Sequence, residues 1–397
     1  MNVGHGLWQL DPSVIYLNHG SLGACPIPVL DAQRAWRDKM EQRPVAFLLR
    51  ELAPKMEHVR RVLGALVGAD PDDLALVTNA TTAVNTVLRS LDFQPGDELL
   101  TTNHEYNACL NSLEVVAQRT GARVVKAHVP FPVTGSDDVL GPILGAVTPR
   151  TRLALVSHVT SATGIIFPIR EIVAALAARG VDVLVDGAHA PALLDLDIDG
   201  IGAAYYAATG HKWICSPKGT GFLHVRRDKQ AAIRPLVISH GTNDPRTEIS
   251  LFRREFDWQG SNDPSGFLAI PAAVDTLDGL VDGGLAALRQ RNHDLALRAQ
   301  DMLCDVLDAP VPVPPAMISA MTAVTIDHLF TDDESRTRLD AALRGESGIE
   351  VPIMRCGLDP GQPPRWLIRV SCQGYNDEGD IDALRAALKA GRPAGQK

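Results

Sequence analysis

Residues 181–190 read VDVLVDGAHA, and this pattern sets the architecture expected for the chain. The first five residues are almost all apolar, as in a strand buried on both faces of a parallel sheet. Asp186 then stands where that strand should end. A buried carboxylate is costly unless it meets a charged or hydrogen-bonding partner. Asp186 is therefore a candidate site residue, although a helix N-cap would also explain an aspartate here.

Around this strand, short β-rich runs alternate with helical patterns. Strands are expected at 74–77, 98–101, 123–127, 153–157 and 181–185, with helices from about 81 and 107, near 139–147 and after residue 168. Such alternation indicates βαβ units and a mostly parallel sheet, with the ligand at the carboxyl ends of the strands. Before it, residues 26–67 are typical of two helices, with a break near Arg43 and Pro44.

The pattern changes from about residue 264. Two long helical patterns cover 264–308 and a proline-rich connection follows. Then come a strand (320–326), a helix (about 334–344), two strands (350–353 and 366–370) and a last helix (about 377–391). We therefore expect a large domain (20–263), a smaller α+β domain (264–397) and an N-terminal segment (1–19) that packs with the small domain.

The composition excludes several classes of protein. The 397 residues are 45% apolar and 21% charged, which predicts a packed core. A net charge of −9 and only 5% aromatic residues argue against a nucleic-acid-binding protein. The six cysteines form no CxxC pattern, so no metal site is predicted and a reduced cytoplasmic protein is expected. No secretory leader and no long apolar stretch stand out.

Three further motifs carry chemistry. Lys212 follows an apolar run and stands in TGHKW (209–213), although a lone lysine more often lies on a surface. Small and hydroxyl residues in VTNATTAVN (77–85) come between a strand and a helix, where free N–H groups suit a phosphate or simply receive an N-cap. Tyr106, in HEYNA (104–108), could stack on a planar ring or fill the core or its rim.

Taken together, these motifs match the needs of pyridoxal 5′-phosphate (PLP). The cofactor requires a phosphate cradle, a stacking aromatic side chain, a carboxylate that keeps the pyridine nitrogen protonated, and a lysine that forms a Schiff base. The sequence has no GxxxxGK[ST], HExxH or GxSxG motif that would favour another chemistry.

With these motifs in place, the chain resembles the class V aminotransferase-like enzymes of PLP fold type I, and most of all isopenicillin N epimerases. The resemblance rests on LNHGSLG (17–23), FLLREL (47–52), TNATTAVN (78–85), SHVTSATG (157–164), VDGAHAP (185–191) and GHKW (210–213). It implies the α/β PLP-dependent transferase fold type I: a large domain with a mostly parallel sheet of the seven-stranded type, plus a smaller α+β C-terminal domain.

The resemblance also implies a role for each matching residue. Lys212 is the Schiff-base lysine, Asp186 pairs with the pyridine nitrogen, and His189 lies near the phenolic oxygen of the ring. Tyr106 takes the place of the histidine that stacks on the ring in cysteine desulfurases. The phosphate is assigned to Ala80, Thr81, Thr82, Thr209 and His211.

Other roles concern the partner subunit and the substrate. Gly260 and Ser261 match a pair that reaches the phosphate of the other subunit, which implies a homodimer with shared active sites. Ser161 stands where desulfurases carry an asparagine, so its cofactor contact should be weaker. Arg369, in RVSCQGYN (369–376), matches the arginine that binds the substrate α-carboxylate, and Asn18 is assigned to the substrate as well.

The reaction stays open between several outcomes. The chain is expected to act at Cα of an α-amino acid, either as an epimerase of secondary metabolism or as a C–S β-lyase or decarboxylating deaminase. Desulfurase or aminotransferase activity ranks lower, and Lys212 and Asp186 argue against a noncatalytic scaffold. Asn262 and Asp263 stand where epimerases tend to carry an Arg–Asp pair.

Three more side chains lie near these motifs in the sequence, and each has its own expectation. Cys356 is expected to be incidental and not a persulfide carrier, because its surroundings do not reproduce the desulfurase loop. His158 is expected in the core or just behind the site, and His104 is expected to face solvent.

Overall fold

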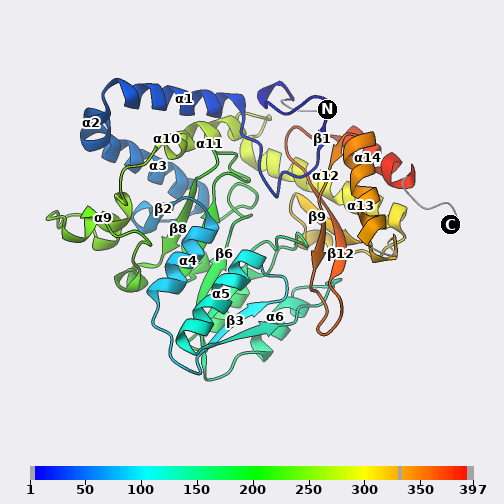
Figure 1. Ribbon diagram of the computed structural model, residues 1–397, viewed down its shortest axis with the longest axis horizontal. Coiled ribbons are helices and arrows are strands. Elements are labelled where there is room, and N and C mark those ends of the chain that lie inside the picture. Colours follow the sequence, from blue (N-terminus) through cyan, green and yellow to red (C-terminus); the bar gives the residue numbers. More distant parts are fainter. Residues whose placement is uncertain (1–4, 330–332, 391–397) are drawn as a thin grey trace.

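The computed structural model describes residues 5–329 and 333–390 of the chain. A sheet flanked by helices forms the larger part, and the C-terminal elements form a smaller part beside it (Figure 1). Within the described residues, no helix is both long and apolar enough to cross a membrane.

The large sheet has seven strands. Their order is β2 (Leu74–Val77), β8 (Gly221–Val225), β7 (Tyr205–Thr209), β6 (Asp182–Asp186), β5 (Thr151–Ser157), β3 (Glu98–Thr102) and β4 (Arg123–Ala127). β8 runs antiparallel to both of its neighbours, and every other pair is parallel. The mostly parallel sheet predicted from the alternating pattern is confirmed, whereas β8 was not predicted.

Helices bury both faces of this sheet. Val183 and Val185 of β6 belong to one hydrophobic cluster and Leu184 to the other, as the alternation of side chains along a strand requires. On the Leu184 face lie α4 (Ala80–Ser90), α5 (Asn107–Thr120) and α9 (Leu251–Asp257). On the opposite face lie α3 (Leu52–Val67), α6 (Asp137–Gly145), α7 (Ile169–Ala177) and α11 (Ile270–Asp278).

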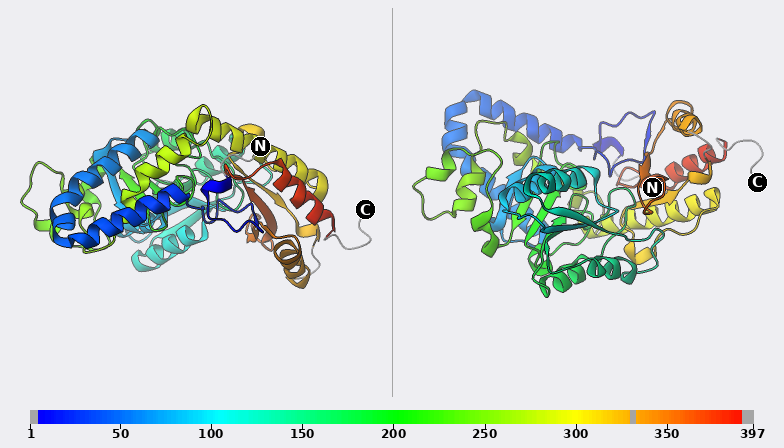
Figure 2. Two further views of the ribbon diagram at one scale, coloured as in Figure 1. Left: turned by 90° about the horizontal axis from the view of Figure 1, so that it is seen from above. Right: turned by 60° about the horizontal axis from the view of Figure 1, so that its bottom comes forward.

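The N-terminal helices follow the predicted break. α1 (Ile27–Gln42) runs along one edge of the molecule (Figures 1 and 2) and ends before Arg43, which has φ −151° and ψ 68°. Pro44 explains this break, because a residue that precedes proline is driven out of the helical region. α2 (Pro44–Ala46), a π-helical turn (Phe47–Glu51) and α3 then complete the hairpin.

The smaller part is built on an antiparallel sheet of β11 (Ile353–Cys356), β12 (Arg365–Ser371) and β9 (Met321–Thr325), in that order. α12 (Gly284–Leu307) packs on β9 and against α14 (Glu378–Ala390). β1 (Ile15–Tyr16) pairs in parallel with β10 (Ile349–Glu350), so the N-terminal segment contacts this part. The remaining helices are α8 (Ile198–Ile201), α10 (Ser265–Leu268) and α13 (Asp333–Ala341).

The sheet brings the motifs of the large part to one edge. β2, β3, β6 and β7 all run in the same direction, so their carboxyl ends meet there. Asp186 is the last residue of β6 and Thr209 the last of β7, and α4 begins shortly after β2. The strand order, which cannot be read from the sequence, therefore brings together segments as distant along the chain as Ala80 and Thr209, which are 129 residues apart.

Candidate active site

Lys212 lies in the loop after β7, with its amine turned into the interior. Nζ lies 3.1 Å from Nε2 of His189 and 5.9 Å from the centre of the Tyr106 ring. Burial lowers the pKa of Lys212 from 10.5 to about 8, although the charge of Asp186 acts in the opposite direction. An amine with a lowered pKa is available as a nucleophile or base near neutral pH.

His189 supports the neutral form of this amine. Trp213 Nε1–H donates to Nδ1 of His189 at 3.2 Å, so the ring proton resides on Nε2, the atom that faces Lys212. Burial holds the pKa of His189 well below 6.5, and the ring is therefore neutral. A neutral imidazole that presents an N–H can donate to the lone pair of an uncharged lysine.

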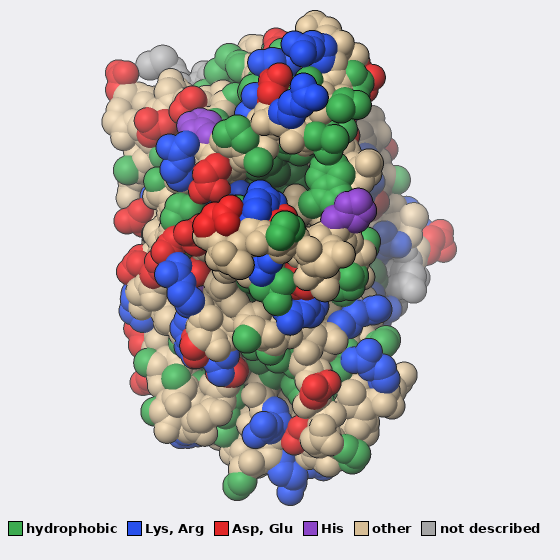
Figure 3. All heavy atoms as spheres, turned by 90° about the vertical axis from the view of Figure 1, so that its left-hand side faces the viewer, with side chains coloured by type: hydrophobic (Ala, Val, Ile, Leu, Met, Phe, Trp, Pro, Cys, Tyr) green, Lys and Arg blue, Asp and Glu red, His purple; other side chains and the backbone are tan. Residues whose placement is uncertain are grey.

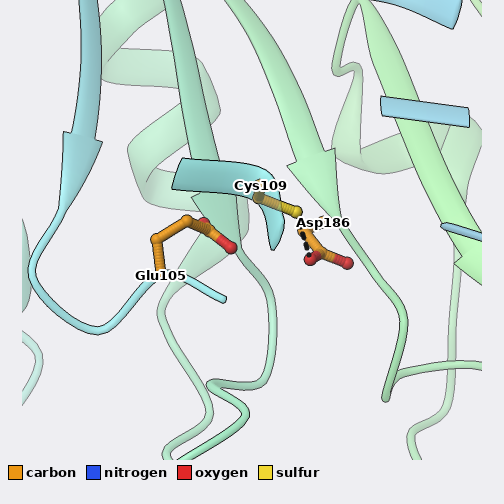
Figure 4. Close-up of side chains that lie close together, drawn as sticks. All are labelled: Glu105, Cys109 and Asp186. Carbon is orange, nitrogen blue, oxygen red and sulfur yellow. Dashed lines mark hydrogen bonds between the residues drawn. The ribbon is translucent and has the colours of Figure 1, made fainter. Parts of the chain in front are cut away.

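Asp186 closes β6 and is almost fully buried. Its Oδ1 accepts the N–H of Ala188 at 2.9 Å, and its Oδ2 accepts the thiol of Cys109 at 3.3 Å (Figure 4). The structure thus places a hydrogen-bonded carboxylate at the strand end, and the backbone contact to Ala188 stabilises a turn. The alternative of a helix N-cap is wrong here, because the next described helix, α8, begins only at Ile198. Two donors leave the carboxylate free to accept a further N–H.

Glu105 is a second buried acid beside Asp186, and the sequence analysis did not single it out. Its Oε1 accepts from Ser157 Oγ at 2.9 Å and from the N–H of Tyr106 at 2.8 Å, while its Oε2 is buried without a partner among the described residues. Burial, and then the charge of Asp186, raise the pKa of Glu105 to about 8. Glu105 therefore carries a proton at neutral pH.

The buried side chains of Glu105, Cys109 and Asp186 are better suited to bind a group that donates a proton than to bind a metal ion. Ligand atoms of Glu105, Cys109 and Asp186 lie within 4.8 Å of one another. However, Glu105 is protonated at neutral pH, and burial raises the pKa of Cys109 well above 9. Metals bind the deprotonated forms of these groups, so the cluster fits a protonated ring nitrogen at Asp186 more closely.

We expect Glu105→Gln to flatten the dependence of stability on pH. The folded protein keeps the Glu105 proton up to about pH 8, whereas the unfolded chain loses it near pH 4.5. The contribution of Glu105 to the free energy of unfolding is therefore complete below about pH 4.5 and is lost as the pH rises towards 8. The uncharged amide has no such dependence.

Urea unfolding at several pH values in this window checks the expectation. The midpoint should fall less with rising pH in Glu105→Gln than in the unchanged protein. Glu114→Gln, a matched change on the exposed side of α5, should follow the unchanged protein. Equal slopes in all three proteins would show that Glu105 is ionised when folded.

The start of α4 provides part of the anion-binding site that the sequence predicts. Asn79 caps the helix by accepting the N–H of Thr82 at 2.8 Å, and Thr209 Oγ1 accepts the N–H of Ala80 at 3.1 Å. Thr209 thus joins the end of β7 to the helix start. N-capping, the plainer reading of this motif, is confirmed for Asn79. Thr81 lies in the same first turn, where a helix start favours an anion.

His211 adds a buried ring nitrogen beside the lysine that has no hydrogen-bond partner in the described part of the chain. This atom is a donor in the tautomer that carries the ring proton on Nδ1. Burial lowers its pKa to about 4, so the ring is neutral, and its Nδ1 is buried without a partner among the described residues. A buried ring nitrogen without a partner is unfavourable unless a ligand meets it. This atom therefore agrees with the anion-binding role expected for His211.

Arg369, on β12, is a buried cation without an acidic partner. Its Nη1 donates to the carbonyl of Ser161, and its Nη2 donates to Ser21 Oγ at 2.6 Å and Asn18 Oδ1 at 3.4 Å. Nε has no partner, and no carboxylate among the described residues pairs with the guanidinium. Burial lowers its pKa to about 10, which leaves it charged at neutral pH.

A buried, unpaired guanidinium is costly, and an incoming carboxylate would remove that cost. Arg369 also lies close enough to Lys212 and His189 to lower the pKa of both. The structure thus brings together the sequence-predicted base and the sequence-predicted carboxylate site. Asn18 and Ser161 contact Arg369, Ser161 through its backbone carbonyl and not its hydroxyl.

The other expectations have mixed outcomes. His104 does not face solvent: it is buried because the rings of Phe131 and Phe167 pack against it. It bonds Thr163 Oγ1 at 2.8 Å and the carbonyl of Val129 at 3.1 Å. His158 is a core histidine, as expected, and bonds the hydroxyl of Tyr206. Cys356 lies on β11, where burial raises its pKa to about 11.

Gly260 and Ser261 lie at the surface of this chain. Ser261 is exposed, and a Cβ at Gly260 would meet no atom within 4 Å. Their predicted contact with the phosphate of a partner subunit stays a prediction.

The family that the sequence matches agrees with the geometry of this site. Residues 24–384 match the family model described as Aminotransferase class-V. The chain belongs to the class V aminotransferase family. The cofactor of this family is PLP, and the described residues fit it: a lysine with a lowered pKa, a buried carboxylate, an anion-favouring helix start and an unpartnered histidine nitrogen.

Two proteins that are similar to this chain bear on its reaction. The chain is 35% identical over 395 residues to an isopenicillin N epimerase of Amycolatopsis lactamdurans, with 96% of each chain covered. It is 31% identical to a probable chloroplastic L-cysteine desulfhydrase of Arabidopsis thaliana, with 95% of this chain and 83% of the relative covered. The family, as predicted, includes relatives of both reaction types.

Solved structures bear on the fold alone. The cystine C–S lyase C-DES in complex with cysteine persulfide is 24% identical, with a TM-score of 0.78 over 96% of this chain and 99% of that chain. The apo cysteine desulfurase from Thermococcus onnurineus NA1 is 21% identical, with a TM-score of 0.81 over 98% of each. The predicted PLP fold type I is confirmed.

Proposed function

We propose that this class V enzyme exchanges the Cα proton of an α-amino acid, as an epimerase of the isopenicillin N type does. One observation carries the proposal: a lysine amine with a lowered pKa, a buried hydrogen-bonded carboxylate and a buried guanidinium with no acidic partner among the described residues meet at one edge of the sheet. These groups correspond to a base, a ring-nitrogen partner and an α-carboxylate anchor.

Each residue then has a stated task. When bound, PLP supplies the electron sink for the charge that develops at Cα. Lys212 would hold the cofactor aldehyde and, once a substrate amine has displaced it, remove the Cα proton. Asp186 would keep a proton on the pyridine nitrogen, and His189 would lie near the phenolic oxygen. Tyr106, 45% exposed, would cover the ring face.

The phosphate would be held by the start of α4 and by the loop that carries the lysine. Arg369 would orient the substrate by its α-carboxylate, with Asn18 and Ser161 holding the guanidinium in place. The identity of 35% across nearly the whole length of the epimerase supports proton return to Cα as the outcome. As part of this proposal, the enzyme acts in secondary metabolism, as expected from its resemblance to the epimerases.

The second candidate is a C–S β-lyase. It is favoured by the 31% identity to a probable L-cysteine desulfhydrase, which also spans most of this chain. The two reactions share Lys212, Asp186 and Arg369 and differ after the proton is removed: a lyase expels a leaving group from Cβ. A decarboxylating deaminase is a further variant, and desulfurase or aminotransferase activity ranks below these.

Incubation with candidate amino acids in deuterated water separates the reactions. Deuterium at Cα of a mixture of both configurations, without a keto acid, is the outcome expected of the epimerase. Pyruvate together with sulfide or a thiol would assign the lyase, and carbon dioxide would assign the decarboxylating variant. Substrates without a group that can leave from Cβ serve as controls against the lyase, because an epimerase can still exchange their Cα proton whereas a β-lyase cannot release a keto acid from them.

We expect Arg369→Ala to weaken substrate binding while leaving the cofactor in place. A charge-assisted hydrogen bond contributes about 1.5–3 kcal/mol, which corresponds to roughly a ten- to hundred-fold rise in KM. Arg369→Lys should recover only part, because an ammonium cannot form the paired contact of a guanidinium. Steady-state kinetics and the absorbance of the bound cofactor measure the two effects.

Arg365→Ala is the matched control for this change. Arg365 lies on the same strand and pairs with Asp327 away from the site, so its loss should leave KM unchanged. Loss of cofactor absorbance in Arg369→Ala would make the arginine structural. Normal binding of amino acids by that variant would assign the carboxylate to another group.

We further propose that two copies of the chain form a cytoplasmic homodimer that shares its active sites. Gly260 and Ser261 would reach the phosphate in the partner subunit. Support comes from the face around α2 and α9 shown in Figure 3, where Leu48, Leu49 and Trp258 help to line a hollow of about 390 Å³. Leu49 is 69% exposed, and an interface between two subunits would cover this side chain.

Complementation tests the shared site. A chain with Lys212→Ala and a chain with Ser261→Asp should each be inactive, since the second places a negative charge at the phosphate. In a mixed dimer one of the two sites would combine an intact lysine with an intact serine, so about half of the activity should return. Failure to complement, or sedimentation of a fully active monomer, would contradict the proposal.

A further inference from the structure

Residues 18–23, NHGSLG, lie between the loop of Lys212 and Arg369. The segment is anchored to β12 from its first residues: the N–H of Ser371 donates to the carbonyl of Leu17 at 2.9 Å, and Asn18 forms a bridge with Ser371. We call it the N-terminal strap. The strap contacts both the loop of Lys212 and the side chain of Arg369, and the proposed function requires these two residues at a fixed distance from each other.

His19 is the contact of the strap with the lysine loop. The side chain is fully buried, its Nε2 lies 3.0 Å from the carbonyl oxygen of Lys212, and its Nδ1 lies 2.8 Å from the hydroxyl of Tyr375. A carbonyl only accepts hydrogen bonds, so Nε2 carries the ring proton and Nδ1 accepts the Tyr375 hydroxyl. Burial lowers the pKa of His19 to about 3, so this neutral form persists at working pH.

The backbone of the strap fits closely at both ends. A Cβ at Gly23 would lie 2.5 Å from the carbonyl oxygen of Lys212 and 2.6 Å from that of His211. A Cβ at Gly20 would lie 2.8 Å from Ser371 Oγ and 2.5 Å from Met321 Sδ. Side chains at these two positions would push the strap away from the lysine loop and from β12.

Ser21 and Asn18 are the contacts with Arg369. The guanidinium donates to the Ser21 hydroxyl at 2.6 Å and to the Asn18 amide oxygen at 3.4 Å. These are two of the three hydrogen bonds that the guanidinium forms among the described residues, and the third goes to the backbone carbonyl of Ser161. One short segment therefore contacts the main chain of the lysine and the head of the arginine.

We propose that the N-terminal strap positions the catalytic lysine relative to the carboxylate-binding arginine, with His19 Nε2–H as the contact that holds the main chain of Lys212. The proposal rests on the proposed function for the roles of Lys212 and Arg369. His19 touches neither substrate nor cofactor in this assignment; it acts through the lysine backbone, and is a positioning residue.

Two substitutions at His19 separate its hydrogen bond to the Lys212 carbonyl from its hydrogen bond with Tyr375. The amide nitrogen of glutamine reaches about as far as Nε2, so His19→Gln can still donate to the carbonyl of Lys212. The amide of asparagine reaches about as far as Nδ1, so His19→Asn keeps a partner for Tyr375 but loses the contact with the lysine. A role in packing alone would make the two variants equivalent.

We expect His19→Asn to lower kcat by about ten- to a hundred-fold, because a displacement of about 1 Å at a catalytic group has effects of that order. His19→Gln should stay within about threefold of the unchanged enzyme. His19→Asn should also shift the pH at which the bound cofactor changes its absorbance, since the lysine moves relative to His189. Ser21→Ala should instead raise KM at an unchanged kcat.

Amide hydrogen exchange of residues 209–216 provides a readout that does not depend on activity. The exchange rate should rise in His19→Asn and stay near that of the unchanged protein in His19→Gln. Equal exchange and equal kcat in the two variants would overturn the proposal. If the unchanged enzyme turns over no amino acid while the exchange pattern holds, the proposed function fails and the positioning of Lys212 stands.

Discussion

Lys212→Ala should abolish turnover and leave no covalent attachment of the cofactor. A positioned general base contributes about 10²–10⁴-fold to a rate, and Lys212 is proposed to bond the cofactor as well, so the loss should be at the upper end of this range or beyond it. In the unchanged enzyme, borohydride reduction followed by peptide mass analysis should place the cofactor on Lys212. The alanine variant should lose it on dialysis after reduction.

Two other lysine changes act as controls. Lys212→Arg keeps a positive charge and most of the volume but cannot bond the aldehyde, so it should be as inactive as the alanine variant. Lys218, the next lysine along the chain, donates to the carbonyl of Gly23, and Lys218→Ala should still be labelled at Lys212. Recovery of the label on Lys218 in the unchanged enzyme would refute the assignment.

The second large effect is expected from Asp186→Asn. The variant should retain the cofactor but lower kcat steeply, because a neutral side chain no longer stabilises a proton on the ring nitrogen. Removal of one preorganised electrostatic contact costs about 10²–10³-fold in kcat. The asparagine can still accept the N–H of Ala188, so the fold of the loop after β6 should persist. Kinetics together with the cofactor spectrum measure both outcomes.

Asp182→Asn supplies the comparison for that change. Asp182 begins the same strand and pairs with Lys229 at the far end of the sheet, so its loss should leave kcat unchanged. The Asp186→Asn change should also lower the pKa of Glu105, since the charge of Asp186 is one of the two causes that raise it. Unchanged turnover in Asp186→Asn would mean that this carboxylate only stabilises the turn after β6.

Much of the fold follows from local patterns in the sequence. The strands near 74–77, 98–102, 123–127 and 182–186 were predicted because each is a short run of residues that favour β-structure, and their alternation with helices indicated a parallel sheet. β8 was missed because GFLHV follows a glycine-rich turn and has no helix before it. Its antiparallel pairing with β2 and β7 is long-range.

The expected strand at 350–353 is in fact divided between β10 and β11. Pro352 lies between them and has no N–H to give to a ladder, so β10 pairs with β1 and β11 with β12. The proline was visible in the sequence, but the partner of each half was not. Which strand pairs with which is decided by packing between distant segments, not by local propensity.

The sequence by itself determined the residue types at the site and the strand ends that carry them. Lys212, Asp186 and Tyr106 each stand at a position that an α/β sheet turns towards its ligand. The tertiary structure decided which charges are buried and which have partners. It placed Glu105 beside Asp186, buried His104 and brought the N-terminal strap to the lysine. Within the part of the chain that the structure describes, it also left Arg369 without a carboxylate partner. The physical reason is that a pKa and an unpaired charge depend on burial and on neighbours from other parts of the chain, which no local pattern records.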